Sequence, residues 1–445
     1  MTNPPRPPRR PWLSPALCLL LAAAAVGAWG WPRWEAWSDL KGAQAALVER
    51  DYKAASNRLR AVLERNPDHP EGLFLQARVA RHLGDLAQYE KSLTRARELG
   101  FAPQRIQVEE SLLQAQNGLM DVALPQLPRL LQMASETDGQ EICEAYVNGF
   151  FSTYNFPEAF KLLEVWQKDY PLDAQPYYCR GLYETHVGSE TEAVKELRQA
   201  LELAPQRDEI RRFLAEGLID LEQFEEAEQH IRYLVQRQPG NVDLTTALAH
   251  CLLEKGDLGE ARKVLQSQLK TDPDSPPARL VMGQLELREQ HPEEALRWLE
   301  PIVKARPFEY NARFQYATAL QHAGRGSEAV EHLKFVAEAQ AALGRARNLM
   351  DKAKDDPEDV ASRLEIGQTL LKYDSPDDGA HWLRNVLQLE PDNVAAHAGL
   401  ADYYERQANE ERAEFHRQRA GLSREEQLET KGTKSESSDP RGTGQ

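Results

Sequence analysis

An interval of 34 residues recurs along most of this chain, and it constrains the fold more than any other feature. Six alanines follow one another at this spacing, and an aliphatic residue stands four positions after each of them. The six pairs are Ala159 and Leu163, Ala193 and Leu197, Ala227 and Ile231, Ala261 and Leu265, Ala295 and Leu299, and Ala329 and Leu333. Periods of this size are typical of stacked repeats. The chain is therefore expected to form a solenoid, in which each unit contacts its neighbours.

Each repeat has the pattern of two helices joined by a short turn. In one unit an apolar helix opens at Pro176, Gly188 and Ser189 interrupt it, and a second helix runs to Leu203 before Pro205. Glycine and serine supply the turn, and proline prevents continuation of the helix. A single hairpin of this kind cannot bury its own apolar stripe. Stacking of successive hairpins is therefore required.

This unit resembles the tetratricopeptide repeat, which has a small residue at its eighth position, alanine at its twentieth and proline at its thirty-second. The eighth position of units five to nine is Gly181, Ala215, Ala249, Gly283 and Ala317, and the closing proline of units four to eight is Pro171, Pro205, Pro239, Pro273 and Pro307. Eleven units are expected to start at Ala36, Pro70, Gln104, Gln140, Ala174, Asp208, Val242, Pro276, Tyr310, Val360 and Val394. The resemblance implies an all-α, right-handed α-solenoid of helix-turn-helix repeats.

Two units depart from the alanine expected at the twentieth position. Unit two has Tyr89 there, and unit ten has Gly379. A bulky tyrosine pushes two helices apart, and glycine lowers helix stability, so both units are predicted to be loosely packed.

One insertion interrupts the period, because Leu333 and Leu383 are 50 residues apart, which is one repeat plus 16 residues. The second helix of unit nine is expected to continue into the insertion with an apolar stripe. This extension fits either a projecting docking helix or a helix packed on its own array, and the packed form is favoured.

The N-terminus differs in composition from the repeats. Residues 1–11 are basic and proline-rich, and residues 12–31 contain no charged side chain. Twenty helical residues span about 30 Å, the thickness of a hydrocarbon core. We expect residues 12–31 to form a transmembrane helix or signal-anchor, with a cleaved signal peptide as the alternative; Arg9 and Arg10 faintly resemble a twin-arginine export signal. Arginines before the span predict a single-pass protein of the cell membrane with its repeats on the extracytoplasmic (periplasmic) side.

The expected organisation has six segments. These are a basic N-terminus (1–11), the transmembrane segment (12–31), repeats one to nine (36–343), the inserted helical extension (344–359), repeats ten and eleven with a solvated cap (360–420), and a disordered tail (421–445).

Composition excludes several classes of function. The formal charge is -16 with 28% charged residues and no basic cluster in the repeats, which argues against a nucleic-acid partner. Catalytic, nucleotide-binding and metal-binding motifs are absent, so no enzyme, cofactor or metal site is expected. Cys143, Cys179 and Cys251 fall on apolar helical stretches and are predicted to be buried, unreactive thiols.

In the family that this chain resembles, ligands usually lie on the concave face formed by the first helices. Carrying those positions over predicts a peptide groove, because aromatic rings beside polar groups suit an extended peptide. The groove residues are Asn148, Phe151, Tyr178, Leu182, His186, Arg212, Glu216, His250, Gln284, Arg288, Phe314, Thr318 and His322.

The sequence thus predicts a membrane-tethered scaffold or adaptor that binds proteins outside the cytoplasm. One alternative is a cytoplasm-facing regulatory subunit of a membrane or envelope-biogenesis enzyme. A second alternative is a structural spacer without a peptide ligand.

Overall fold

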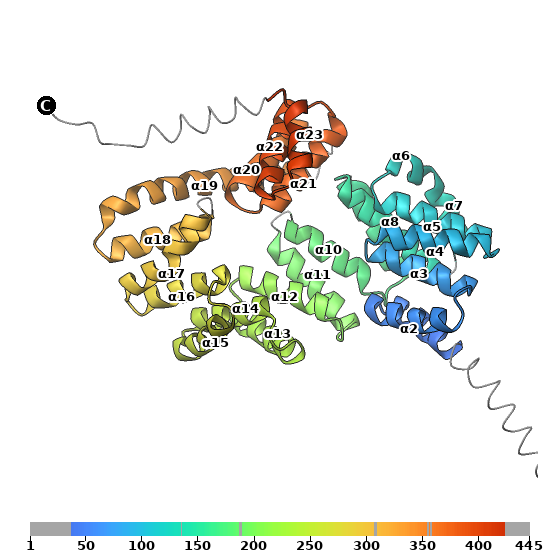
Figure 1. The fold of residues 1–445 in the computed structure, drawn as a ribbon, viewed down its shortest axis with the longest axis horizontal. Helices are drawn as coiled ribbons and strands as arrows, with labels where there is room; N and C mark the ends of the chain where they lie inside the picture. The colour runs from blue at the N-terminus through green and yellow to red at the C-terminus, as the bar shows by residue number, and fades with distance from the viewer. Residues whose placement is uncertain are drawn as a thin grey trace, which may run out of the picture. The chain divides into compact units, whose positions relative to one another are not determined.

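The structure is a computed structural model that describes residues 37–134, 136–186, 189–306, 309–353, 356 and 358–422 (Figure 1). Throughout these residues helices alternate with short turns, and they contain no strand. This arrangement confirms the all-α prediction. The predicted transmembrane segment, residues 12–31, and residues 423–445 of the predicted tail lie outside the described residues.

The described part of the chain holds no helix with both the length and the apolar character of a membrane span.

The chain divides into two compact units, residues 1–145 and 146–445. The sequence had predicted repeats one to nine as an uninterrupted array over residues 36–343. The division falls inside helix α8 (Glu136–Ser152), which is the first helix of the fourth predicted repeat.

Unit 1 contains three helical repeats, the last of which is irregular. Its helices are a segment over residues 37–48, α2 (Tyr52–Arg65), α3 (Pro70–His82), α4 (Leu86–Glu98), α5 (Pro103–Gln116), α6 (Met120–Ala123), the 3-10 turn η1 (Leu124–Gln126), α7 (Leu127–Met133) and the start of α8. The second helix of the third repeat is replaced by α6, η1 and α7. Pro125 and Pro128 lie in this stretch, and proline removes a backbone donor and clashes with the preceding turn.

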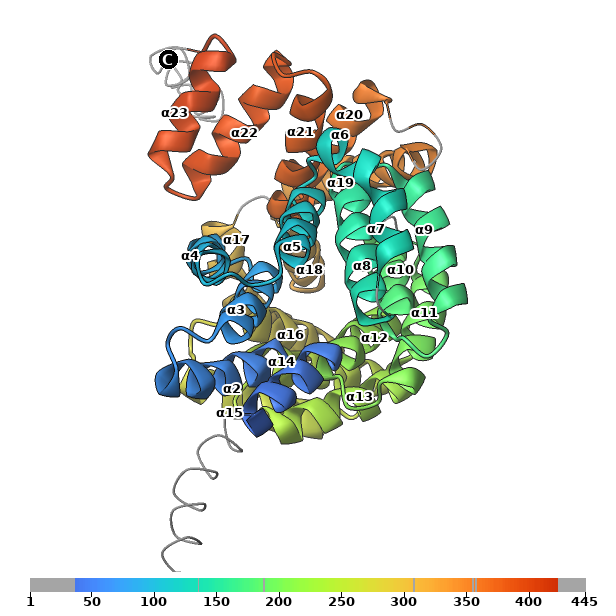
Figure 2. The same cartoon turned by 90° about the vertical axis from the view of Figure 1, so that its right-hand side faces the viewer.

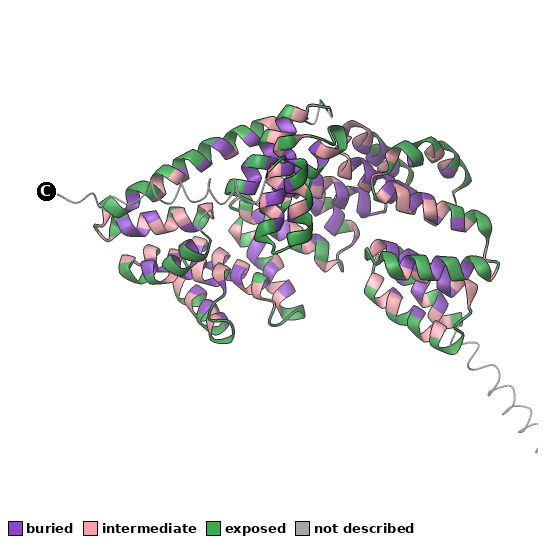
Figure 3. Cartoon of the chain, turned by 45° about the horizontal axis from the view of Figure 1, so that its top comes forward, coloured by how far each residue is buried: buried purple, intermediate pink, exposed green. Residues whose placement is uncertain are grey.

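Unit 2 continues as a row of antiparallel hairpins (Figures 1 and 2). Its helices after α8 are α9 (Phe156–Asp169), α10 (Gln175–His186), α11 (Glu190–Leu203), α12 (Asp208–Asp220), α13 (Phe224–Arg237), α14 (Val242–Lys255), α15 (Leu258–Thr271), α16 (Pro276–Arg288), α17 (Pro292–Ala305), α18 (Tyr310–His322), α19 (Gly326–Ala353), α20 (Val360–Tyr373), α21 (Pro376–Leu389), α22 (Val394–Arg406) and α23 (Glu410–Arg419). Buried residues follow one side of the helices and exposed residues the other (Figure 3).

The predicted repeat starts agree closely with the observed first helices. Helices α3, α12, α14, α16, α18, α20 and α22 begin at the predicted residue, and α5 and α10 begin one residue away from it. Helix α8 begins four residues earlier than predicted, at Glu136 rather than Gln140.

The turn inside each hairpin has a fixed backbone geometry. The fifteenth residue of nine repeats has a positive φ, in the left-handed region, and four of these residues are glycines. The nine residues are Arg50, Gly84, Gly118, Tyr154, Glu222, Gly256, Gln290, Gly324 and Ala408. In the tenth repeat Asp374 occupies this position with φ -137° instead. Side chains other than glycine are strained in the left-handed region, so packing of the flanking helices must hold Tyr154 there.

The prediction of loose packing in repeat ten is wrong, because Gly379 brings α20 and α21 close together. A Cβ atom at this position would lie 2.4 Å from the Leu371 nitrogen and 2.7 Å from the Gly367 oxygen, both of which are backbone atoms of α20. Nor does Tyr89 stand loosely in repeat two, since it is buried and its hydroxyl donates a hydrogen bond of 3.2 Å to the Glu109 carbonyl.

The inserted residues extend α19 to 28 residues. Its apolar stripe is buried, at Val336, Ala339, Ala342, Ala346 and Met350. The extension therefore packs on unit 2, in agreement with the favoured interpretation, and does not project as a free docking helix.

The last hairpin, α22 and α23, contains a pair of contacting histidines. The Nδ1 atoms of His397 and His416 are 2.8 Å apart, and His397 Nε2 lies 2.9 Å from the Pro391 carbonyl. That carbonyl requires a proton on His397 Nε2, so in the neutral pair His416 Nδ1 is the donor between the rings. Burial lowers the pKa of His416 to about 4, with His397, Arg384 and Arg412 adding to the effect.

Candidate functional site

The thirteen predicted groove residues all lie on first helices of unit 2. These helices are α8, α10, α12, α14, α16 and α18, and contacts join α10 to α12, α14 to α16 and α16 to α18. The predicted residues are therefore distributed along successive helices of one unit.

Their exposure differs from residue to residue. Arg212, Glu216, Arg288, Phe314 and His322 are exposed, and Asn148, Phe151, Leu182, His250, Gln284 and Thr318 are half-buried. Tyr178 is buried, and the side chain of His186 lies outside the described structure.

Several of the exposed charges pair with each other. Arg212 Nη1 lies 2.7 Å from Glu216 Oε1, and Arg288 Nη2 lies 2.7 Å from Glu254 Oε2. These pairs are solvent-exposed, so they contribute little stability and can exchange for contacts to a ligand.

Tyr178 does not lie in an open groove, which differs from its predicted place. It belongs to the main core cluster of unit 2, and its ring centroid is 5.8 Å from that of Phe213 in the next repeat. The guanidinium of Arg207 lies 5.1 Å from the Tyr178 ring. Tyr178 therefore stabilises the stacking of two repeats.

Three predicted groove residues do come together at a cavity of about 740 Å³ within unit 2, which we call the closure cavity. Asn148, Phe151 and Leu182 line one wall, from α8 and α10. The opposite wall comes from α19, α20 and α21, and includes Leu343, Met350, Leu370 and Trp382. Cavities of about 300–1,000 Å³ are the usual size for ligand sites.

A continuous series of aromatic rings joins the two walls of the closure cavity. Phe151 and Tyr183 stack with centroids 5.2 Å apart, and Phe156 lies 4.7 Å from Tyr183 and 5.5 Å from Tyr154. Tyr154 in turn lies 4.3 Å from Trp382. Repeat four is thus packed directly against repeat ten, and repeat five joins the same aromatic series through Tyr183.

A buried arginine that does not line the cavity lies close to two of these rings. The guanidinium of Arg363 is 4.9 Å from the Tyr154 ring and 5.9 Å from the Trp382 ring. It donates a hydrogen bond to Asn385. Burial lowers the pKa of Arg363 from its ordinary value.

The ionisable residues that line the closure cavity are mainly acidic. Glu190, Asp374 and Asp378 supply carboxylates, and Arg347 is the one lysine or arginine among the described lining residues. The Asp374 side chain is exposed, but the surrounding protein still desolvates its carboxylate and raises its pKa; neighbouring Asp378 raises this pKa further, while Arg347 lowers it. No ion pair within 4.0 Å joins these three carboxylates to any other described residue.

Unit 1 contains a buried charge network that the sequence did not reveal. Glu109 accepts hydrogen bonds from Arg78 Nε at 3.0 Å and from Arg81 Nε at 2.6 Å, and Arg81 also donates to Glu141 at 2.5 Å. Burial opposes ionisation of Glu109, but Arg81 and Arg78 hold its pKa below the ordinary value. These charges neutralise one another inside the core, so the network is structural.

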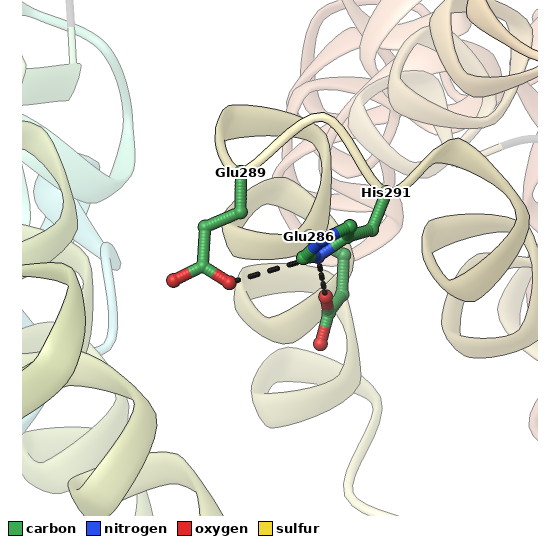
Figure 4. Close-up of side chains that lie close together, drawn as sticks. All are labelled: Glu286, Glu289 and His291. Atoms are coloured by element: carbon green, nitrogen blue, oxygen red, sulfur yellow. Dashed lines mark hydrogen bonds and ion pairs between the residues drawn. The ribbon is translucent and has the colours of Figure 1, made fainter.

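One histidine and two carboxylates on α16 and its following turn are close enough to hold a metal ion (Figure 4). His291 Nδ1 lies 3.2 Å from Glu286 and 3.7 Å from Glu289. However, Arg262 already contacts both carboxylates, at 2.7 Å and 2.6 Å. A cation would have to displace this guanidinium, so the cluster is better explained as an ion-pair network.

The three cysteines of the repeats are buried and form no disulfide among the described residues. Their burial agrees with the prediction. Burial raises the pKa of Cys251 to about 12, so its reactive thiolate form is scarce at neutral pH.

Family comparisons identify the repeats. Models described as tetratricopeptide repeats match residues 40–103 in unit 1 and residues 218–285 and 252–312 in unit 2. The matched residues fall in both units. Tetratricopeptide repeats generally mediate interactions between proteins. No curated protein matches the chain.

Several solved structures are similar to the chain at low identity and low TM-score. The tetratricopeptide-repeat domain of P58(IPK) has 17% identity, covers 91% of this chain and 99% of its own, and gives a TM-score of 0.28. PilW, described as a type IV pilus biogenesis factor, has 17% identity, covers 47% of this chain and 94% of its own, and gives a TM-score of 0.38. The human IFIT1 dimer with PPP-AAAA has 16% identity, covers 78% and 90%, and gives a TM-score of 0.35. With TM-scores this low, no function is carried over from these proteins.

Proposed function

We propose that unit 2 binds a segment of a partner polypeptide on the face formed by its first helices, so that the chain acts as a scaffold or adaptor. The observation that carries this proposal is the composition of that face. Phe314 is an exposed aromatic residue, 42% exposed, and Arg212, Glu216 and Arg288 are exposed charged side chains that form ion pairs near the surface. Aromatic area beside exchangeable polar groups suits an extended peptide.

In the same proposal residues 12–31 tether the scaffold to the membrane, with the repeats outside the cytoplasm. The support comes from the uncharged run of residues 12–31 and the arginines before it. A tether raises the effective concentration of partners near the bilayer. The proposed function involves no catalysis, cofactor or nucleic acid, in keeping with the formal charge of -16.

Site-specific photo-cross-linking in cells tests the binding face. A photo-reactive phenylalanine analogue would replace Phe314 on the proposed face and, as the matched control, Val330, which is 63% exposed on α19. The expected result is discrete protein adducts from position 314 and none from position 330. Equal adduct patterns, or none from either position with both variants folded, would instead favour the structural spacer.

A reporter that is active only outside the cytoplasm, fused to the C-terminus of the full chain, tests the topology. Activity together with an intact N-terminus is expected for an anchored extracytoplasmic scaffold. An inactive but stably produced fusion would make the cytoplasm-facing regulatory subunit the leading interpretation.

A further inference from the structure

The closure cavity has features that point to the chemistry of its ligand. Its interior is apolar, formed by Tyr154, Phe156, Met350 and Trp382, which are all buried. Its mouth is polar, because Thr185, Arg347, Asp374 and His381 are exposed lining residues. An apolar interior with a few polar groups at one end is the usual composition of a ligand site.

One buried polar group in this interior has no partner. The Tyr154 hydroxyl makes no hydrogen bond with any described residue, although Tyr154 is only 4% exposed. A buried hydroxyl without a partner is destabilising by roughly 1–3 kcal/mol. The hydroxyl oxygen is itself covered by neighbouring atoms, so a ligand in the cavity must displace them to hydrogen-bond to it and remove that penalty.

The turn residues of repeats four and ten both lie at this cavity. Tyr154 and Asp374 are the fifteenth residues of repeats four and ten, and both line the closure cavity. Tyr154 retains a φ of 56°, where a side chain is strained, whereas glycine occupies this position in several other repeats. The closure of unit 2 thus places an aromatic ring and a carboxylate on opposite walls.

The charge of the lining selects the sign of the ligand. Glu190, Asp374 and Asp378 outnumber Arg347, and Arg363, although close to the rings of Tyr154 and Trp382, does not line the cavity. A cation at the mouth would gain attraction from the three carboxylates, whereas an anion would be repelled by them. The rings supply flat apolar area for the rest of the ligand.

We propose that the closure cavity binds a primary amine or guanidinium that is carried on an apolar body. The cationic group lies beside Asp374 and Asp378, with Glu190 as a third lining carboxylate, and the apolar body lies against the rings of Tyr154 and Trp382, which meet from the two walls. If the cation is a lysine or arginine side chain of a partner polypeptide, the inference rests on the proposed function. The preference of the cavity for a cation is independent of the proposed function.

Isothermal titration of the full chain with phenylbutylamine and phenylbutyrate tests this preference, because the two probes share a body and differ in charge. The amine is expected to bind at least about tenfold more tightly than the acid. The double variant Asp374→Asn, Asp378→Asn is expected to weaken amine binding about tenfold, and Tyr154→Phe about threefold through loss of one hydrogen bond. Asp377→Asn is the matched control, since Asp377 neighbours Asp378 but does not line the cavity.

The outcomes separate this inference from the proposed function. Equal or tighter binding of the acid, or amine binding that the double variant leaves unchanged, would overturn the cation preference while leaving the cross-linking test of the scaffold intact. Blocked peptides with lysine or norleucine beside phenylalanine supply the second comparison. Binding of the lysine peptide but not the norleucine peptide supports a polypeptide source of the cation. If the amine binds and neither peptide does, the cation preference is supported, but the cavity is not part of the polypeptide site.

Discussion

Substituting Gly379 by alanine provides a sharp test of how closely α20 and α21 pack. The new Cβ would lie 2.4 Å from the Leu371 nitrogen and 2.7 Å from both the Leu371 Cα and the Gly367 oxygen, against an ordinary contact of 3.4–4 Å. All three atoms belong to the backbone of α20, so no side chain can rotate away. The two helices must therefore separate by about 1 Å, and overpacking of this kind costs about 1–3 kcal/mol.

Helix propensity opposes this cost, because alanine is about 1 kcal/mol better than glycine inside a helix. With rigid backbone on the other side, the cost falls in the upper half of its range, and Gly379→Ala is expected to lose about 1–2 kcal/mol of unfolding free energy. Gly344→Ala is the matched control. It lies inside α19, a Cβ there would meet nothing within 4 Å, and it is expected to gain up to about 1 kcal/mol.

Urea unfolding followed by circular dichroism measures both variants, and hydrogen exchange shows whether the loss falls on α20 and α21. The same substitution should thus change stability in opposite directions at the two positions. If Gly379→Ala were as stable as the unsubstituted chain while Gly344→Ala was stabilised, the close approach of these helices would be refuted.

Three further predictions concern buried polar groups. Glu109→Gln leaves two buried arginines without their shared carboxylate and is expected to cost about 3–5 kcal/mol in urea unfolding, whereas Glu110→Gln, at an exposed ion pair, should cost less than about 0.5 kcal/mol. The pKa of His416 is about 4 in the folded hairpin, below its ordinary value of 6.5, so the unfolded chain takes up a proton at higher pH than the folded chain does. The stability of α22 and α23 should therefore decline as the pH falls from 6.5 toward 4. In thermal unfolding, His416→Gln should weaken this pH dependence. Cys251 should resist iodoacetamide in the native chain at pH values well below about 12 and react after urea is added, as read by mass spectrometry; native labelling would contradict its burial.

Periodicity predicted the local parts of this fold well. The positions of small residues and prolines placed most first helices within one residue, because each repeat encodes its own hairpin and its contacts to the next one. The sequence also contains the cause of the irregular third repeat, because Pro125 and Pro128 stand where its second helix is expected.

Contacts between distant repeats could not be predicted in this way. Tyr154 and Trp382 both fit their own repeats as ordinary aromatic residues, and nothing in a 34-residue period indicates that they touch. The second wall of the closure cavity was missed for this reason. The groove positions transferred from the family gave the first wall, at Asn148, Phe151 and Leu182, but placed Tyr178 in the groove when it packs in the core.

The burial of charged residues was the hardest feature to predict from the sequence. Arg78, Arg81 and Glu109 were indistinguishable in sequence from the solvated charges that cover most helices of this acidic chain. Their burial depends on three helices meeting at one point, and only coordinates show that their charges are matched.

The packing of repeat four against repeat ten changes how unit 2 should come apart. In an open row of hairpins the terminal repeats fray first, and stability is close to a sum over neighbours. Here the first and last hairpins of a long stretch share one aromatic core, so neither can open without exposing the rings of the other. Unfolding in this stretch should therefore be more cooperative than in an open row. Anything that binds in the closure cavity would also hold both ends together and delay the opening of every repeat between them.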